Sequence, residues 1–172
     1  MAQPPVSNEK LQQLLDKQEI HEVIMRYCRG IDRLDREMIR SVYHDDAIDE
    51  HGLWKGNADE FVAYVIPVLQ KEIATTHLIC NELIEVDGDV AWGESYFLAV
   101  HRRDAREGGQ MHYQFCGRYI DRFERRKGVW KIAHRNVVHS WSRKEHIKDQ
   151  FPGADQAPQG IRSKEDLVYK RA

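Results

Sequence analysis

The chain has 172 residues, of which 41% are hydrophobic and 31% charged, the balance of a single globular domain that buries a core of its own. Its 26 Lys and Arg residues are offset by 28 Asp and Glu residues, and the basic side chains are scattered along the chain. This excludes nucleic acid as a main partner. No apolar run reaches the roughly 20 residues of a membrane span, and the polar N-terminal stretch carries no signal core. We expect a cytoplasmic protein with no membrane partner.

The sequence predicts two helices before its first strand. Apolar residues recur at helical spacing from Asn8 to about Ile31, with Ser7 available as the N-cap. This pattern is typical of a long amphipathic helix. A second, short helix is expected after Asp35, whose side chain can cap it.

A short strand, a glycine turn and a brief return strand are expected over residues 47–56. Asn57 and Glu60 then have the spacing of a capping box. They predict a third helix over residues 58–70, which Pro67 should kink or shorten.

The second half of the chain has a strand-like composition. Val, Ile, Tyr, Phe, Trp and Thr dominate four long segments, residues 75–86, 90–103, 111–126 and 129–141. Short turn-forming separators predict that neighbouring segments pair as an antiparallel meander. Helices followed by strands indicate an α+β domain over residues 1–142, with the helices packed on one face of a curved sheet. Residues 143–172 are rich in Pro, Gly and charge, and we expect an extended or mobile C-terminal tail.

Cofactor motifs are absent from the sequence. Cys28, Cys80 and Cys116 are far apart and fall in segments with helix or strand patterns, so we expect buried free thiols in a reducing compartment. Residues 44–51 gather histidines and carboxylates without the spacing of a metal site. Phosphate-loop, G-x-S-x-G and C-x-x-C motifs are also missing. We therefore expect neither a metal nor an organic cofactor.

Asp32 is the residue whose position most needs an explanation. Helical spacing places it beside Cys28 and Ile24, on the apolar flank and near the end of the first helix. Burial and the negative helix C-terminus both disfavour a carboxylate there, so Asp32→Asn is expected to be at least as stable as the parent. Either Arg33 or Arg36 neutralises Asp32, or it pairs with an imidazole that it holds as a general base.

Two histidines are candidates for the same site. His77 opens the first long strand and could supply the imidazole, or it could be a hydrogen-bonded structural residue. On the second long strand, one face consists mostly of small residues and ends at His101; it carries Ala91, Gly93, Ser95, Phe97 and Ala99. Such a face either leaves room for a cavity, in which His101 would be a polar group, or simply allows the sheet to bend.

Four further residues are candidates for substrate binding. Arg118 shares a strand face with apolar residues, where it could bind an anionic or phenolic oxygen or pair with an acidic neighbour. Tyr27, Tyr43 and Trp54 could line a pocket for a flat substrate, or they could be plain core.

The order of these motifs resembles the SnoaL-like branch of the nuclear-transport-factor-2-like superfamily. The likeness runs from about Glu19 to Ser142, through GIDRLDREMIRSVYHDDA, WKGNADEFVAYV, TTHLICNELIEVDGD and GRYIDRFERRKGVWKIAHR. It is strongest to the members that include scytalone dehydratase and hexachlorocyclohexane dehydrochlorinase. The resemblance implies a cone-shaped α+β barrel, a homotrimer, and an aspartate–histidine dyad in a conical pocket. The matching positions are Asp32 and His77, and His101 is similar to a further pocket histidine.

The resemblance implies a cofactor-independent lyase of the elimination or dehydratase type, or an isomerase, acting on a small hydrophobic or aromatic substrate. The dehydratases carry tyrosines where this sequence has Ile31 and Glu50, which argues against a scytalone-like substrate. The alternative is a non-catalytic module on the same scaffold that binds a small ligand or serves assembly, because one fold hosts many functions.

Overall fold

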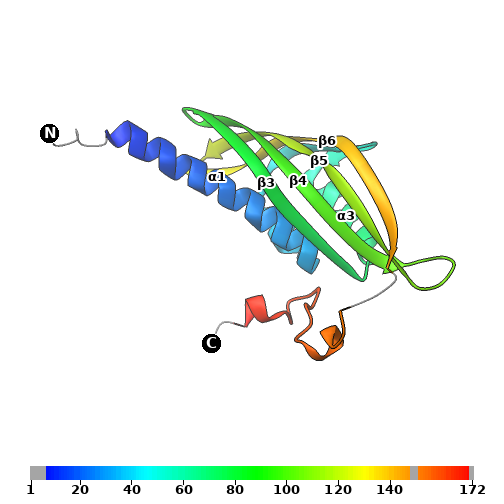
Figure 1. Cartoon of the computed structure of the whole chain (residues 1–172). Helices are drawn as coiled ribbons and strands as arrows, with labels where there is room; N and C mark the ends of the chain where they lie inside the picture. Colours follow the sequence, from blue (N-terminus) through cyan, green and yellow to red (C-terminus); the bar gives the residue numbers. More distant parts are fainter. Residues whose placement is uncertain (1–6, 148–150, 171–172) are drawn as a thin grey trace.

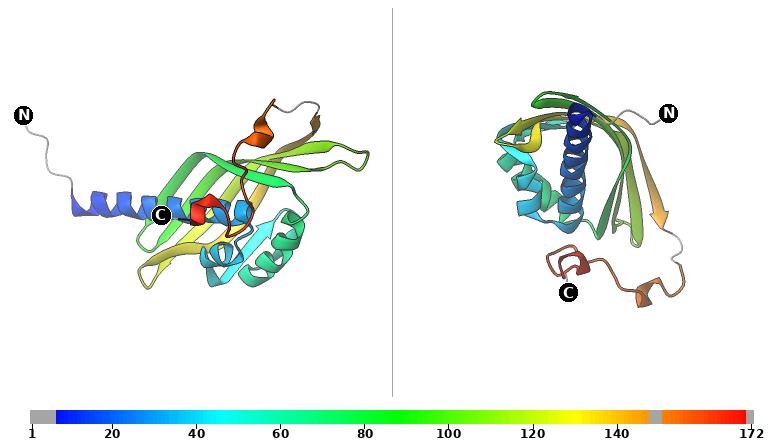
Figure 2. Two further views of the ribbon diagram at one scale, coloured as in Figure 1. Left: turned by 90° about the horizontal axis from the view of Figure 1, so that it is seen from below. Right: turned by 90° about the vertical axis from the view of Figure 1, so that its left-hand side faces the viewer.

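The computed structural model describes residues 7–147 and 151–170, and it places three helices against a curved six-stranded sheet (Figure 1). Viewed end-on, the sheet wraps around the first helix without closing into a complete barrel (Figure 2). The expected α+β fold, with helices packed on a strongly curved and mainly antiparallel sheet, is confirmed.

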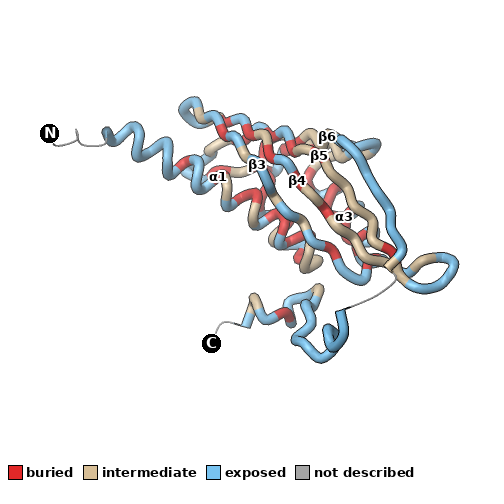
Figure 3. The backbone as a smooth tube through the Cα atoms, viewed as in Figure 1, coloured by how far each residue is buried: buried red, intermediate tan, exposed pale blue. Residues whose placement is uncertain are grey.

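The first two helices form as their caps predict. Helix α1 (Asn8–Arg33) begins where the Ser7 hydroxyl accepts a hydrogen bond from the first turn, and it ends where Leu34 adopts a left-handed backbone. Asp35 then caps helix α2 (Arg36–Ser41) through its side chain. The start of α1 lies beyond the sheet and is exposed, and burial begins further along the helix (Figure 3).

Helix α3 (Ala58–Leu69) begins with the predicted capping box, in which Asn57 and Glu60 satisfy each other's backbone groups. Pro67 lies inside the last turn, and the helix ends two residues later. The proline lacks the backbone donor that would pair with the carbonyl of Ala63, and its place in the last turn is consistent with the helix ending there.

The sheet contains the predicted meander and one pairing that the sequence did not predict. Its strand order is β2-β1-β6-β5-β4-β3. The strands are β1 (Tyr43–His51), β2 (Trp54–Asn57), β3 (Ala74–Asp87), β4 (Val90–Asp104), β5 (Gln110–Arg126) and β6 (Val129–Ile147). Strands β3 to β6 pair antiparallel in chain order, whereas β1 pairs parallel to β6. Strand β6 also continues past residue 142, where the sequence pattern placed the end of the domain.

The core lies between α1, α3 and the concave face of the sheet. Its centre is an ion pair: Arg135 is completely buried and donates to both carboxylate oxygens of Asp121, at 2.8 and 2.6 Å. The guanidinium lies over the rings of Tyr27 and Tyr119, 4.2 and 4.1 Å from their centroids. These aromatic faces and the carboxylate compensate a charge that would otherwise be costly to bury.

The cysteines differ partly from expectation. Cys28 is buried and Cys116 is partly buried, but Cys80 is exposed. Cys80 lies next to a register shift between Ile79 and Glu82 in β3, and such irregularities turn side chains away from the regular alternation. Within the described part of the chain, no helix is both long and apolar enough to cross a membrane.

The C-terminal segment, residues 151–170, is anchored to the body of the protein, where the sequence predicted an extended or mobile tail. It contains two short 3-10 turns, η1 (Ala154–Gln156) and η2 (Leu167–Tyr169), and it passes the end of α1 (Figure 2). Its Asp166 is buried and ion-paired with Arg33 at 3.3 Å, and Tyr169 donates its hydroxyl to Asp35 at 2.9 Å.

Candidate active site

Asp32 and His77 are brought together where the end of α1 packs against β3. Nδ1 of His77 donates to Oδ1 of Asp32 at 2.8 Å, and the backbone N–H of His77 donates to Oδ2 at 3.0 Å. Thr75, on the same face of β3, donates its hydroxyl to Oδ1 at 2.9 Å. These three hydrogen bonds explain how a carboxylate is accommodated near the end of a helix.

The hydrogen bonds also set the charge of the pair. Burial by itself raises the pKa of Asp32, but the bonds from His77 and Thr75 outweigh it and hold that pKa below its ordinary value. Asp32 is therefore ionised at neutral pH and favours the tautomer of His77 that carries its proton on Nδ1. Nε2 is then left as the basic nitrogen. The His77 side chain is only 9% exposed and that of Asp32 14%, so bulk water reaches them poorly.

His101 is the next polar group along the inner wall. Its ring lies edge-on to His77, with centroids 5.6 Å apart, and also contacts Phe115. Burial, together with the neighbouring His77, lowers the pKa of His101 to about 4. His101 is therefore neutral at pH 7 and able to donate one hydrogen bond.

Glu72 links His101 to the rim of the sheet. Its fully buried carboxylate lies 3.7 Å from Nδ1 of His101 and accepts a hydrogen bond from Nε of Arg103 at 3.0 Å. The carboxylate is thus shared between a neutral ring and a guanidinium. The Nδ1 side of the His101 ring therefore faces a negative charge.

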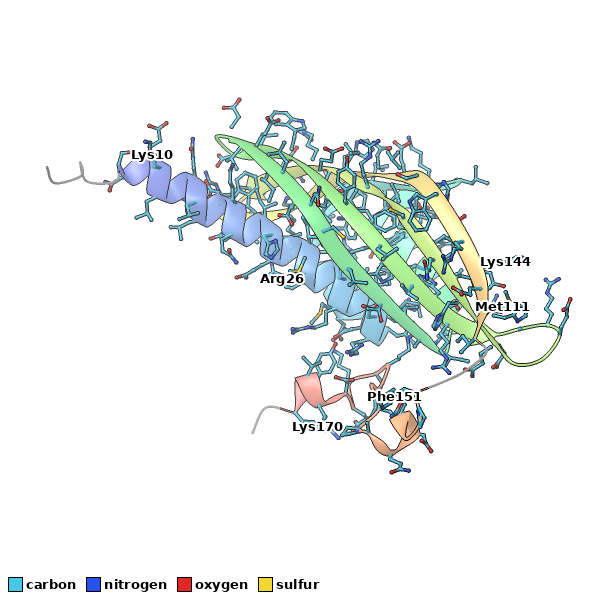
Figure 4. All side chains as sticks on the ribbon, in the orientation of Figure 1. Lys10, Arg26, Met111, Lys144, Phe151 and Lys170 are labelled. Carbon is cyan, nitrogen blue, oxygen red and sulfur yellow. The ribbon has the colours of Figure 1, made fainter. Side chains whose placement is uncertain are left out.

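A hollow of about 540 Å³ lies at the far end of β4, β5 and β6, beyond His101. Figure 4 labels two of its lining residues, Met111 and Lys144, at this end of the sheet. Arg103 is also in its wall and connects it, through Glu72, to His101. Asp32 and His77 do not line this hollow.

The structure places Arg118 away from the Asp32–His77 pair, and a role for it in substrate binding remains a prediction. Arg118 lies on the opposite face of β5 from the buried Gly117 and Tyr119. There it donates to Glu94 on β4 at 2.6 Å. Of the two interpretations of Arg118, pairing with an acidic neighbour is the one that the structure supports.

The three aromatic candidates lie in or beside the core. Tyr27 and Tyr43 are buried, pack edge-to-face on each other, and contact Phe61. Tyr43 also donates its hydroxyl to Asp49 at 2.6 Å. Trp54 is partly exposed and stacks on Tyr64 at 5.1 Å. None of these contacts involves the Asp32–His77 pair, and a role in substrate binding remains a prediction.

Four residues of the network were not singled out from the sequence: Thr75, Glu72, Arg103 and Arg162. Thr75 had a signal, because it precedes His77 on the same strand face. Glu72 reaches the site from the loop after α3, Arg103 from the end of β4, and Arg162 from the C-terminal segment. In these places the sequence has no hydrophobic periodicity that would predict an inward-facing side chain. In residues 7–147 and 151–170 there is no group of three or more His, Cys, Asp or Glu side chains that could hold a metal ion.

The curved, unclosed sheet wrapped around helices is an α+β fold that the solved structures compared below share. The SnoaL-like domain family matches residues 12–136. The chain therefore belongs to the SnoaL-like family. Among curated proteins, none matches this sequence significantly.

Several solved structures share the fold. Hexachlorocyclohexane dehydrochlorinase LinA-type3 from Novosphingobium barchaimii is 20% identical, with a TM-score of 0.67 over 82% of this chain and 99% of its own. A protein from Novosphingobium aromaticivorans, provisionally assigned as a scytalone dehydratase, is 19% identical, with a TM-score of 0.68 over 83% and 95%. A single-residue variant of Rv3472 from Mycobacterium tuberculosis, a protein of unknown function, is 26% identical, with a TM-score of 0.66 over 75% and 74%.

Proposed function

We propose that this protein is a cofactor-independent lyase or isomerase, in which His77, oriented by Asp32, removes a proton from a carbon atom of a small hydrophobic or aromatic substrate. The observation that carries this proposal is the 2.8 Å contact between Nδ1 of His77 and the Asp32 carboxylate. It leaves Nε2 as the base, and it supplies the negative charge that stabilises the imidazolium formed by proton transfer.

In an elimination, the electron pair of the broken C–H bond becomes a carbon–carbon double bond while a neighbouring halide or hydroxyl group departs. The proton goes to Nε2 of His77. His101 is neutral at pH 7 because its pKa is lowered to about 4, and with its single N–H on Nδ1, facing Glu72, its Nε2 could accept a hydrogen bond from a hydroxyl group of the substrate. In an isomerisation, the proton on His77 would return to another carbon of the same substrate.

The names of the relatives indicate which compounds to test first. One is a hexachlorocyclohexane dehydrochlorinase and another is provisionally a scytalone dehydratase. Membership of a family that includes such relatives supports lyase chemistry for this chain and leaves its substrate open. A probe set should therefore contain halogenated cyclohexanes and cyclic β-hydroxy ketones.

The test is incubation of each probe with the purified protein in D₂O, read by mass spectrometry for deuterium uptake or loss of HX or water. Turnover by the parent and its loss in His77→Ala would support the proposal. His21→Ala is a matched control, because His21 forms a similar pair with Glu82, at 3.0 Å, between the same two elements. Equal turnover by parent and His77→Ala would contradict a base role for His77.

A second candidate function is small-ligand binding without chemistry. It is favoured by the near-complete burial of His77 and Asp32, whose side chains are 9% and 14% exposed, and by their absence from the wall of the hollow. Under this alternative, a probe should bind the protein, as measured by calorimetry, and remain unchanged. Binding should then be insensitive to His77→Ala.

A further inference from the structure

We infer that Arg162, from the C-terminal segment, is a positioning residue for the Asp32–His77 pair, so that this segment forms part of the site. Arg162 donates through Nη2 to Oγ1 of Thr75 and through Nε to the backbone oxygen of Asp32, both at 3.3 Å. The effect of this positioning role on turnover rests on the function proposed above, whereas the contacts of Arg162 do not depend on that proposal.

Arg162 is held by groups that favour a positive charge. Its Nη1 donates to the backbone oxygens of Leu69 and Glu72, both at 2.7 Å. The backbone oxygen of Asp32 lies at the end of α1, that of Leu69 at the end of α3, and that of Glu72 in the loop after α3. The C-terminal end of a helix leaves carbonyl acceptors unpaired and carries partial negative charge. One side chain therefore joins the ends of two helices to β3.

The contact with Thr75 fixes the direction of a hydrogen bond inside the site. A guanidinium has donors but no acceptor, so Oγ1 of Thr75 accepts from Arg162. The single hydroxyl hydrogen of Thr75 is then directed to Oδ1 of Asp32, 2.9 Å away. That same oxygen accepts the Nδ1–H of His77. Arg162 thus controls, through Thr75, the carboxylate that orients the histidine.

The rest of the segment holds Arg162 in place. On its N-terminal side the backbone N–H of Ile161 donates to Asp166 at 2.8 Å, and Asp166 also pairs with Arg33 of α1 at 3.3 Å. On its C-terminal side Lys164 pairs with Glu37 at 2.7 Å. The segment that carries Arg162 therefore forms its own ion pairs with α1 and α2, and these hold the guanidinium beside Asp32 and Thr75.

The test is hydrogen exchange of the His77 Nδ1–H, followed by NMR on full-length protein labelled with ¹⁵N-histidine, without any ligand. The signal is assigned by its loss in His77→Ala. Arg162→Met should speed exchange about tenfold, the effect of weakening a network by roughly one hydrogen bond. Thr75→Val should do the same, and the double variant should add little, because both changes break one relay.

Lys170→Met is the matched control, since it removes an exposed pair of the same segment, with Glu165 at 3.4 Å, without touching Thr75 or Asp32. It should leave the exchange rate unchanged. An Arg162→Met rate within twofold of the parent, or equal acceleration by Lys170→Met, would overturn the positioning role. If Arg162→Met does not fold, Thr75→Val alone decides, because an unchanged rate would also overturn it. The measurement uses no substrate. A negative result would therefore rule out the positioning role of Arg162 without bearing on the proposed reaction, and an absence of turnover would not bear on the hydrogen bonds from Arg162 through Thr75 to Asp32.

Discussion

At the scale of single residues, the carboxylate of Asp32 lies near the C-terminal end of α1, where the helix carries partial negative charge. On that charge alone, Asp32→Asn was expected to be at least as stable as the parent. The structure reverses that expectation, because Asp32 accepts hydrogen bonds from the backbone and ring of His77 and from Thr75, and an amide would satisfy them poorly.

Asp32→Asn should therefore lose about 1–3 kcal/mol of unfolding free energy at pH 7, the usual effect of leaving buried donors poorly paired. Because the pKa of Asp32 is lowered in the folded protein, its stabilising contribution is complete above the unfolded pKa of about 4. It is lost as the pH falls through the folded value. Urea unfolding at several pH values should show the deficit of the variant shrinking below pH ~3.5.

The control for this prediction is Asp45→Asn. Asp45 is an exposed carboxylate that pairs with Arg40 at 2.8 Å, and exposed pairs contribute little. Its variant should unfold almost like the parent at every pH. An Asp32→Asn protein as stable as the parent at pH 7 would contradict the structural account of the carboxylate.

At the scale of helices and strands, local signals were sufficient for most elements. The caps at Ser7, Asp35 and Asn57 and the turn-separated strands are properties of neighbouring residues, so they could be predicted from the sequence. The parallel pairing of β1 with β6 could not, because it joins segments far apart in the chain and depends on closure of the cone. The docking of residues 151–170 is likewise a matter of individual side chains rather than of any periodic pattern.

Gly117 tests the packing of adjacent strands. It lies at the register shift between β5 and β6, where an added Cβ would come within 2.3 Å of the Val138 carbonyl oxygen and 2.9 Å of the Phe97 ring. Gly117→Ala should therefore destabilise the protein by about 1–3 kcal/mol, because a backbone neighbour has to move.

Gly160→Ala is the control for Gly117→Ala, because nothing lies within 4 Å of the added atom. Thermal melts of both variants should separate them clearly. A Gly117→Ala protein that melts with the parent would show that the strands accommodate the methyl group.

At the scale of the whole molecule, the outer face of the sheet exposes large apolar side chains. Trp92, Tyr96 and Trp141 are 49%, 41% and 47% exposed, and Leu83 is 62% exposed. Large apolar side chains exposed on one face of a sheet are typical of protein interfaces. The homotrimer implied by the family resemblance remains our prediction for the protein in solution.

Light scattering after gel filtration should give the mass of an oligomer, with a trimer expected. Trp92→Glu should shift the protein toward the monomer, because burying an unpaired charge at an interface is costly. Leu53→Glu is the control, because Leu53 is fully exposed in the turn between β1 and β2 and should leave the mass unchanged. A parent that elutes as a monomer at micromolar concentration would contradict the prediction.

The candidate site was partly predictable for a physical reason. Asp32 and His77 could be paired through their places at the end of a helix and the start of a strand, with the family resemblance giving them roles. Glu72 and Arg162 could not, because their contributions depend on how a loop and the C-terminal segment pack against the cone. The face on which Arg118 lies could not be predicted, because alternation along β5 does not reveal which face is concave.

The central claim is that His77, held by Asp32, is the base. Its most direct test is the steady-state rate of the parent, His77→Ala, Asp32→Asn and the control His21→Ala on the first probe that the parent converts. Thermal melts of the same samples report the folded fraction. We predict that kcat falls on the order of 10²–10⁴-fold in folded His77→Ala, the usual contribution of a positioned general base. In Asp32→Asn the loss should lie mainly in kcat rather than in KM, and His21→Ala should retain its rate. A folded His77→Ala protein with the kcat of the parent would contradict the claim.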